Sequence, residues 1–167
     1  MQVTICTANC VGQAGNCSYP NKVTVVTPEQ LQEAVKKDHV CAEFKGNYRS
    51  IENFIRSDVI VMDIDNDHTE VPADWITAEK LEELFPNVEY LLAPSRHHLL
   101  DKEGKSARPR YHMYFPISEI TDASGYASLK RAIQSAYSFF DGNALDAARF
   151  IFGAECEEVI FHEGWMT

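Results

Sequence analysis

The sequence predicts an α+β fold in two layers, a β-α-β-β-α-β core preceded by a small β-α-β unit. Apolar stretches of strand length alternate with stretches that begin at helix-capping residues, which is typical of this class. The chain has 167 residues, 45% of them hydrophobic and 24% charged, as in one ordinary globular domain. We therefore expect a single domain over 1–167, with the unit at 1–45 and the core at 46–167.

The first third of the chain predicts a strand, a helix and a second strand. The stretch "KVTVVT" at 22–27 is rich in β-branched residues and predicts the first strand. Thr27 is expected to cap a helix that starts at Pro28, and Gln30 completes a capping box. The stretch "VCAEF" at 40–44 predicts the second strand.

The rest of the chain predicts the core. Its clearest strand is "VIVMDID" at 59–65, and a short helix follows between Thr77 and Pro86. The other expected elements are strands at 88–95 and 110–117, a helix capped by Asp122 and running through 126–140, and short strands at 149–154 and 157–164. A long polar hairpin loop separates the strands at 88–95 and 110–117. This order is a split β-α-β pattern.

Charge is unevenly distributed along the chain. The net charge of −10 argues against a protein that coats nucleic acid through an excess of cations. Acidic residues dominate 58–89 and 141–163, whereas a basic island occupies 96–112. The island contains Arg96, His97, His98, Lys102, Lys105, Arg108, Arg110 and His112. Such separation suits a site where carboxylates hold metal ions and cations hold phosphates.

Composition also bears on location. No apolar run approaches the roughly 18 residues of a membrane span. The start, "MQVTICTANC", lacks the layout of a signal peptide, so we expect a cytoplasmic protein without membrane contact. Five cysteines, an odd number, fit a reducing compartment. A zinc site is an alternative for Cys6, Cys10 and Cys17 with Cys41 or His39, but the spacing lacks paired two-residue gaps, which favours free thiols.

The strand at 59–65 raises a chemical question because it ends in carboxylates. Asp63 and Asp65 share one face of the strand, about 6.6 Å apart along the backbone. Carboxylates are rarely buried unless they are paired or bind a metal. One turn cap and one solvated acid would be the simpler interpretation. Two acids that close an apolar strand favour one or two divalent ions instead.

Two later stretches supply partners for these acids. In "RYHMYFP", Arg110, His112 and Tyr114 share one strand face, and its guanidinium and imidazole suit phosphate oxygens. Tyr111, Met113 and Phe115 share the other face and are expected to belong to the core. In "NALDAARFIFGA", Asp146 precedes Arg149 by one helical turn. These two form either a local ion pair, worth little if exposed, or a third metal carboxylate beside a triphosphate-binding arginine.

In this order the motifs resemble the archaeo-eukaryotic primase superfamily, in its phage and plasmid primase-polymerase branch. That superfamily combines an apolar strand ending in D-x-D, a strand with a single His and a later Asp after an apolar residue. Here they stand as "VIVMDID", "RYHMYF" and "ALDAARF", over about 40–155, and the element order is RNA-recognition-motif-like as in that family. The resemblance implies a primase or DNA polymerase catalytic domain that performs two-metal nucleotidyl transfer from nucleoside triphosphates in phage or plasmid replication.

Carried over to this chain, the resemblance implies that Asp63, Asp65 and Asp146 bind two Mg²⁺ or Mn²⁺ ions. His112 would contact the phosphates of the incoming nucleotide. The other implied nucleotide-binding residues are Arg110, Arg149, Lys45, Arg49, Ser106 and Arg108. The expected partners are nucleoside triphosphates, a single-stranded DNA template held weakly by this acidic chain, and a fused or partner helicase. The chain is small for a complete polymerase, so we expect the template to be held by another domain or protein, such as a fused helicase.

Two other functions remain open from the sequence. A rolling-circle initiator endonuclease needs a His pair on one strand and a helical tyrosine nucleophile, whereas "RYHMYF" has one His and only Tyr126 or Tyr137 as candidates. A non-catalytic nucleic-acid-binding module of RNA-recognition-motif type would stack bases on aromatic residues of its central strands. Asp63 and Asp65 occupy that place here and would repel phosphates without a metal.

Overall fold

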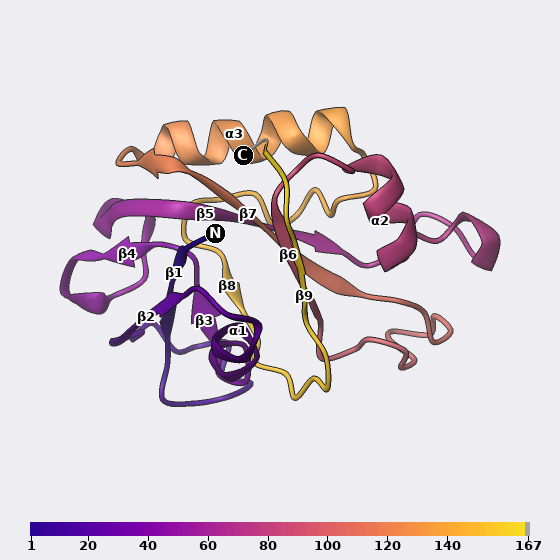
Figure 1. The fold of residues 1–167 in the computed structure, drawn as a ribbon. Coiled ribbons are helices and arrows are strands. Elements are labelled where there is room, and N and C mark those ends of the chain that lie inside the picture. The colour runs from indigo at the N-terminus through magenta and orange to yellow at the C-terminus, as the bar shows by residue number, and fades with distance from the viewer. Residues whose placement is uncertain (166–167) are drawn as a thin grey trace.

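Two antiparallel sheets pack against each other in this computed structural model, which describes residues 1–165 (Figure 1). One sheet has the strand order β2-β1-β3-β8 and the other the order β4-β5-β7-β6-β9. The strands are β1 (Val3–Thr7), β2 (Asn21–Val25), β3 (His39–Val40), β4 (Glu43–Phe44), β5 (Phe54–Ile64), β6 (Tyr90–Pro94), β7 (Tyr111–Ile120), β8 (Phe150–Ile151) and β9 (Ile160–His162). The helices are α1 (Pro28–Ala34), α2 (Ala78–Leu84) and α3 (Ala123–Ala136).

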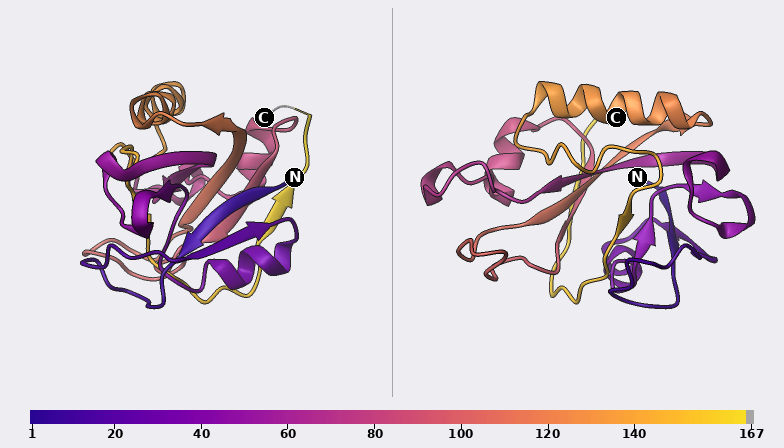
Figure 2. Two further views of the ribbon diagram at one scale, coloured as in Figure 1. Left: turned by 90° about the vertical axis from the view of Figure 1, so that its left-hand side faces the viewer. Right: turned by 180° about the vertical axis from the view of Figure 1, so that it is seen from behind.

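Both faces of the five-stranded sheet are covered. Helices α2 and α3 lie over one face, and the four-stranded sheet with α1 lies on the other (Figures 1 and 2). Along β5, Ile60 and Met62 pack beneath the helices, whereas Val59 and Val61 pack toward the four-stranded sheet. A strand that is buried on both faces has no polar face, which explains the continuous apolar run that made β5 clear in the sequence.

Local chemistry places the helix starts. The side chain of Thr27 accepts from the amide of Gln30, whose own side chain completes the capping box. Thr77 and Asp122 cap α2 and α3 in the same way. The expected helix at 126–140 ends earlier, at Ala136, because the aromatic residues that follow pack as a cluster against Phe85 and Phe115.

The strands differ more from the expectation. Strand β1 is present although no strand was expected before residue 22, and β5 begins at Phe54 rather than at 59. The expected strand at 40–44 is divided between β3 and β4, which belong to different sheets. The predicted α+β class is confirmed. The finer RNA-recognition-motif-like description is not, since β8 joins the four-stranded sheet and β9 pairs with the outer side of β6.

A buried acid joins the C-terminal part of the chain to the four-stranded sheet. Asp38 has no exposed surface, and its carboxylate accepts N–H groups of Gly12, Gln13 and Gly153, each at 2.8 Å. Three backbone donors compensate the burial of one negative charge. Through this contact and the pairing of β8 with β3, residues after α3 complete the sheet that the N-terminal residues begin.

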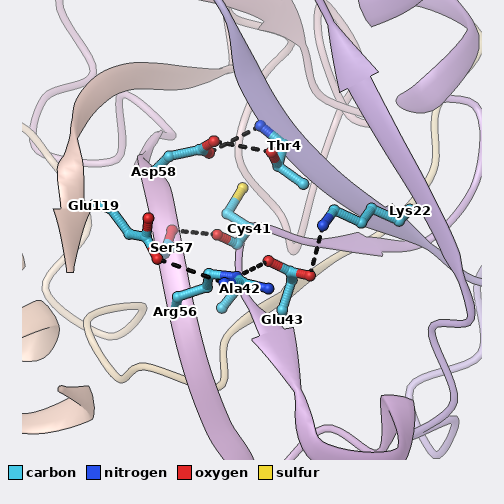
Figure 3. A pocket seen from close by; sticks show the side chains of 9 residues that line it. All are labelled: Thr4, Lys22, Cys41, Ala42, Glu43, Arg56, Ser57, Asp58 and Glu119. Atoms are coloured by element: carbon cyan, nitrogen blue, oxygen red, sulfur yellow. Dashed lines mark hydrogen bonds and ion pairs between the residues drawn. The ribbon is translucent and has the colours of Figure 1, made fainter. Parts of the chain in front are cut away.

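A pocket of about 280 Å³ lies between the two sheets, close to β1 and β4 (Figure 3). Its charged side chains satisfy one another: Glu43 pairs with both Lys22 and Arg56, and Arg56 also reaches Glu119. Asp58 accepts from both the amide and the hydroxyl of Thr4, each at 2.8 Å. The ion pairs and hydrogen bonds of this pocket therefore connect the strands to one another. Each charged side chain that lines it already has a partner within the protein, so none is left to bind a ligand.

Within the described part of the chain, no helix has the length and apolar character needed to cross a membrane.

Candidate functional site

The candidate site lies where β5 ends and the antiparallel strand β7 begins. Asp63 of β5 and His112 of β7 are directly paired in the ladder, one step beyond the buried pair Val61 and Tyr114. Their side chains therefore lie on the face that looks toward the four-stranded sheet. The imidazole Nε2 of His112 lies 3.7 Å from Oδ1 of Asp63. The sequence expectation that these two residues meet follows directly from the register.

Cations from two other segments surround the aspartates. Nη2 of Arg149, next to β8, lies 3.6 Å from Oδ2 of Asp63. Nζ of Lys102, in the loop before β7, lies 3.8 Å from Oδ1 of Asp65. Together these groups line an open pocket of about 510 Å³ between the two sheets. Acidic and basic side chains therefore line one cavity. The uneven distribution of charge along the sequence had suggested a site that combines the two.

Asp63 is incompletely compensated. Its side chain is only 9% exposed, yet no hydrogen bond from the described residues reaches its carboxylate. Its nearest partners, Nη2 of Arg149 at 3.6 Å and Nε2 of His112 at 3.7 Å, lie farther away than the roughly 2.8 Å of a charge-assisted hydrogen bond. A buried carboxylate in this state retains lone pairs that favour a further cation.

The electrostatics of the neighbouring groups agree with this. Burial raises the pKa of Asp65, and Asp63, Asp67 and Asp141 raise it further, although Lys102 opposes them. Burial also lowers the pKa of His112, against the opposing effect of Asp63 and Asp65. His112 is therefore neutral at pH 7 and has one ring N–H to donate. The site holds more negative charge than its cations neutralise.

Asp141 is one of three further carboxylates that line the pocket, with Asp101 and Glu103 of the loop before β7. It follows α3 and lines the same pocket as Asp63 and Asp65, and its amide donates to the carbonyl of Asp63 at 2.9 Å. Asp146, which was predicted from the sequence to be the third metal ligand, is exposed and is not among the described residues that line the pocket. Its carboxylate accepts from the amide of Ala148 at 2.8 Å and so holds a local turn.

The donor chemistry of the pocket fits a hard divalent ion, because carboxylate oxygens are its preferred ligands. Asp63, Asp65 and Asp141 line the pocket near the end of β5, and Asp101 and Glu103 line it from the loop before β7. Within residues 1–165, however, no three His, Cys, Asp or Glu side chains already form a group that could hold an ion. Asp63 and Asp65 would therefore have to exchange their present contacts with Lys102, His112 and Arg149 for a metal.

The same result bears on the zinc alternative. The cysteines are free, and the described residues show no cluster of metal-ligating side chains around Cys6, Cys10 or Cys17. Burial raises the pKa of Cys6 to about 11, which disfavours the thiolate that zinc binds. His39 is occupied in the core, where its ring nitrogens lie 2.8 Å from the carbonyl of Lys37 and 2.8 Å from the hydroxyl of Tyr114.

The arginines before β7 lie outside the pocket. Arg108 is fully buried, donates to the carbonyls of Asn66 and Thr69, and pairs with Glu70 at 2.8 Å. Ser106 accepts one of its N–H groups. Arg108 and Ser106 therefore hold the loop after β5 in place.

Arg110 is also fully buried and likewise contacts the loop after β5. Its Nη1 donates to the carbonyl of Asp65 at 3.0 Å and lies 3.6 Å from the carboxylate of Asp67. The sequence expected Arg110 on the same strand face as His112. The structure instead places it before the start of β7, against this loop.

The turn after β4 contributes one residue near the site. Arg49 donates to the carbonyl of Ala148 at 3.0 Å, and its guanidinium lies 4.8 Å from the ring centre of Phe150, which lines the pocket. Lys45 is exposed and is not among the described residues that line it. Of the two basic residues expected here, the structure brings only Arg49 close to the pocket.

Several pocket residues were not selected from the sequence. Asp141 follows two phenylalanines in "SFFD", the same apolar-then-Asp pattern as "ALD" around Asp146, so the pattern alone does not distinguish them. Lys102 and Arg96 lay in the basic island without an assigned role. Phe152 had no signal in the sequence beyond its place after a short strand.

Comparison with known proteins identifies a fold. No family model matches the chain, and no curated protein matches its sequence. Its structure is similar to the AEP domain (PP-N190) of the cyanophage S-2L primase-polymerase (PrimPol), with a TM-score of 0.53 and 13% sequence identity, over 99% of this chain and 83% of that chain. At this identity the likeness concerns the fold alone, so the chain has a fold similar to that of a phage primase-polymerase AEP domain.

Proposed function

We propose that this chain is the catalytic domain of a phage- or plasmid-type primase-polymerase, a nucleotidyltransferase that adds nucleotides to a primer or to an initiating nucleotide. The observation that carries the proposal is the buried carboxylate of Asp63, without a hydrogen bond and surrounded by Asp65, His112 and Arg149 in an open pocket. The fold similarity to a primase-polymerase domain supports the same conclusion.

In this proposal the acids of the pocket bind two Mg²⁺ or Mn²⁺ ions. Asp63 and Asp65 are the main ligands, and Asp141 is better placed than Asp146 to be the third. When bound, such ions would activate the attacking 3′-hydroxyl and stabilise the leaving pyrophosphate. No side chain has to act as a general base, because phosphoryl transfer depends mainly on positioning and charge stabilisation.

The remaining residues of the pocket hold the triphosphate. Neutral His112 donates its ring N–H to a phosphate oxygen, and Arg149 offers a planar fork for two oxygens. Lys102 adds a point charge that lines the same pocket. Each of these three side chains now lies 3.6 to 3.8 Å from Asp63 or Asp65 and would be released toward the nucleotide when a metal binds the carboxylates.

The experiment is calorimetric titration of the chain with Mn²⁺ and a nucleoside triphosphate, together with a primer-extension assay. Asp63→Asn and Asp65→Asn should abolish both metal-dependent nucleotide binding and extension. Asp141→Asn and Asp146→Asn form a matched pair, and we expect the first to reduce extension far more than the second. Full extension by the Asp63 variant would contradict the proposal, and the reverse order within the pair would restore Asp146 as the third ligand.

A further inference from the structure

One cation of the pocket has no acidic partner. Arg96 is exposed at the rim, between β6 and the loop before β7, and none of the ion pairs among the described residues includes it. The other arginines of this region are paired with acids: Arg108 with Glu70, Arg110 with Asp67 and Arg149 with Asp63. An unpaired cation beside an acidic pocket needs another physical reason for its position.

An aromatic ring supplies that reason. The guanidinium carbon of Arg96 lies 3.8 Å from the ring centre of Phe152, which is the distance of a close stack. Phe152 is itself held by Phe150, edge to face, with ring centres 4.9 Å apart and planes at 90°. The guanidinium of Arg96 thus lies over one ring, and the exposed side chain leaves its other side open to solvent.

The surroundings offer room for a flat apolar group. Arg96 lines the pocket of Asp63 and His112 and also borders a second pocket of about 630 Å³. Leu99 and Tyr111 line this second pocket, and so do four glutamates, among them Glu79 and Glu155. A guanidinium held over one ring at the border of both pockets is suited to stacking on a nucleobase.

We propose that the Arg96–Phe152 stack is a platform for a nucleobase. This inference rests on the proposed function, since it extends the same pocket from phosphate binding to base binding. Two sources can provide the base: the incoming nucleoside triphosphate or a single-stranded nucleic acid that passes the site. Both present the same π-face to the guanidinium, so sequence preference is not expected from this contact.

The test compares probes that differ only in the base. A nucleoside triphosphate is paired with ribose 5-triphosphate, both with Mn²⁺, and single-stranded oligothymidylate is paired with an abasic strand of equal length. The wild-type chain should bind the base-bearing member of at least one pair more tightly. Arg96→Ala should remove about fivefold or more of that affinity and leave binding of the base-free member unchanged.

Two further variants separate stacking from charge. Arg96→Lys keeps the charge and loses the plane, so it should bind almost as poorly as Arg96→Ala. Phe152→Leu keeps apolar volume and removes the ring behind the plane, and it should weaken binding in the same direction. Arg131→Ala, which removes an exposed arginine of α3, is the matched control and should behave like the wild type.

The outcomes are distinguishable. Loss confined to the nucleoside triphosphate identifies the incoming nucleotide as the source, and loss confined to oligothymidylate identifies the strand. Equal loss for base-bearing and base-free probes, wild-type binding by Arg96→Lys, or no base preference in the wild type would each overturn the platform. If the wild-type chain adds nucleotides and Arg96→Ala binds the base-bearing probes as tightly as the wild type, the platform alone is overturned. If binding depends on the base and on Arg96 but the chain adds no nucleotides, only the proposed function is overturned.

Discussion

Asp38 and Asp63 are both buried acids, and the difference between them separates structure from chemistry. Asp38 accepts three backbone N–H groups and has no exposed surface. Asp63 has 7% of its surface exposed and accepts none from the described residues. A carboxylate that accepts several hydrogen bonds is stable in a buried position. A carboxylate whose neighbours lie beyond hydrogen-bonding distance can still bind a further cation.

His39 allows a test at the same scale. Its Nδ1 must carry the proton, because the carbonyl of Lys37 can only accept, so Nε2 accepts from the hydroxyl of Tyr114. Burial lowers the pKa of His39 to about 4 from an ordinary value of 6.5. Between these values the unfolded chain takes up a proton that the folded chain does not. The free energy of unfolding should therefore fall by about 3 kcal/mol as pH drops through this window.

Urea unfolding of the wild type and of His39→Gln at pH 7, pH 5.5 and pH 4.5 measures this effect. The variant should be less stable at pH 7, because two core hydrogen bonds are disturbed. Its disadvantage should shrink as the pH falls, because it lacks the buried imidazole. A constant difference between the two proteins across this range would show that His39 takes up its proton in the folded state as easily as in the unfolded chain.

At the scale of elements, β7 places chemistry and packing on its two faces. Met113 and Phe115 pack beneath α3, whereas Tyr114 packs between the sheets and His112 continues that face into the pocket. The sequence predicted that Tyr111, Met113 and Phe115 belong to the core; Met113 and Phe115 are buried there, whereas Tyr111 is half-buried and lines the pocket of about 630 Å³. Tyr114 is also fully buried, so the other face is an interior surface that opens at His112, near the start of β7.

Substitutions of Met113 and His112 should therefore have different effects, the first on stability and the second on nucleotide binding. Met113→Ala leaves a cavity in a fully buried place and should cost about 2–5 kcal/mol of stability. His112→Ala should leave thermal stability close to that of the wild type and weaken binding of a nucleoside triphosphate with Mn²⁺. Thermal melts and calorimetric titrations of both variants measure this, and a reversed pattern would mean that the faces of β7 are assigned the wrong way round.

At the scale of the whole molecule, Gly153 links the C-terminal part of the chain to the end of α1. Its amide donates to Asp38 at 2.8 Å, and a Cβ atom there would clash with the backbone carbonyl of Lys36. Gly153→Ala should destabilise the protein by about 1–3 kcal/mol, because two backbone segments must move apart. Gly15→Ala, where a Cβ meets no atom, is the control in chemical denaturation. Equal stability of the two variants would contradict this role of the contact.

Charge also acts across the whole molecule. The basic island at 96–112 is largely neutralised, since its lysines and arginines other than Arg96 pair with acids at Asp65, Asp67 and Glu70. With a net charge of −10, the chain should bind single-stranded DNA more weakly than about 1 µM at physiological salt, and more weakly still as salt rises. Fluorescence anisotropy measures this, and nanomolar affinity would contradict it. We propose that a fused or partner helicase supplies the template.

The sequence by itself determined features that depend on neighbouring residues. The caps at Thr27, Thr77 and Asp122, the apolar run of β5 and the opposite faces of β7 were all predicted, because hydrogen bonds and side-chain alternation act over a few residues. The faces on which Asp63 and His112 lie followed from the same alternation, whereas their pairing depends on the register between β5 and β7. Fold class was confirmed for this reason, while the functions of these residues remain proposals.

Only the tertiary structure decided which of several similar residues share the pocket. Asp141 and Asp146 follow apolar residues in the same way, yet only Asp141 lines the pocket of the described chain, because the turn after α3 returns its backbone to Asp63. Arg110 was predicted to bind phosphate, but its guanidinium donates to the carbonyl of Asp65. Arg96 contacts the ring of Phe152, which lies far from it in the sequence. Contacts between segments far apart in the chain depend on packing, which local sequence patterns do not encode.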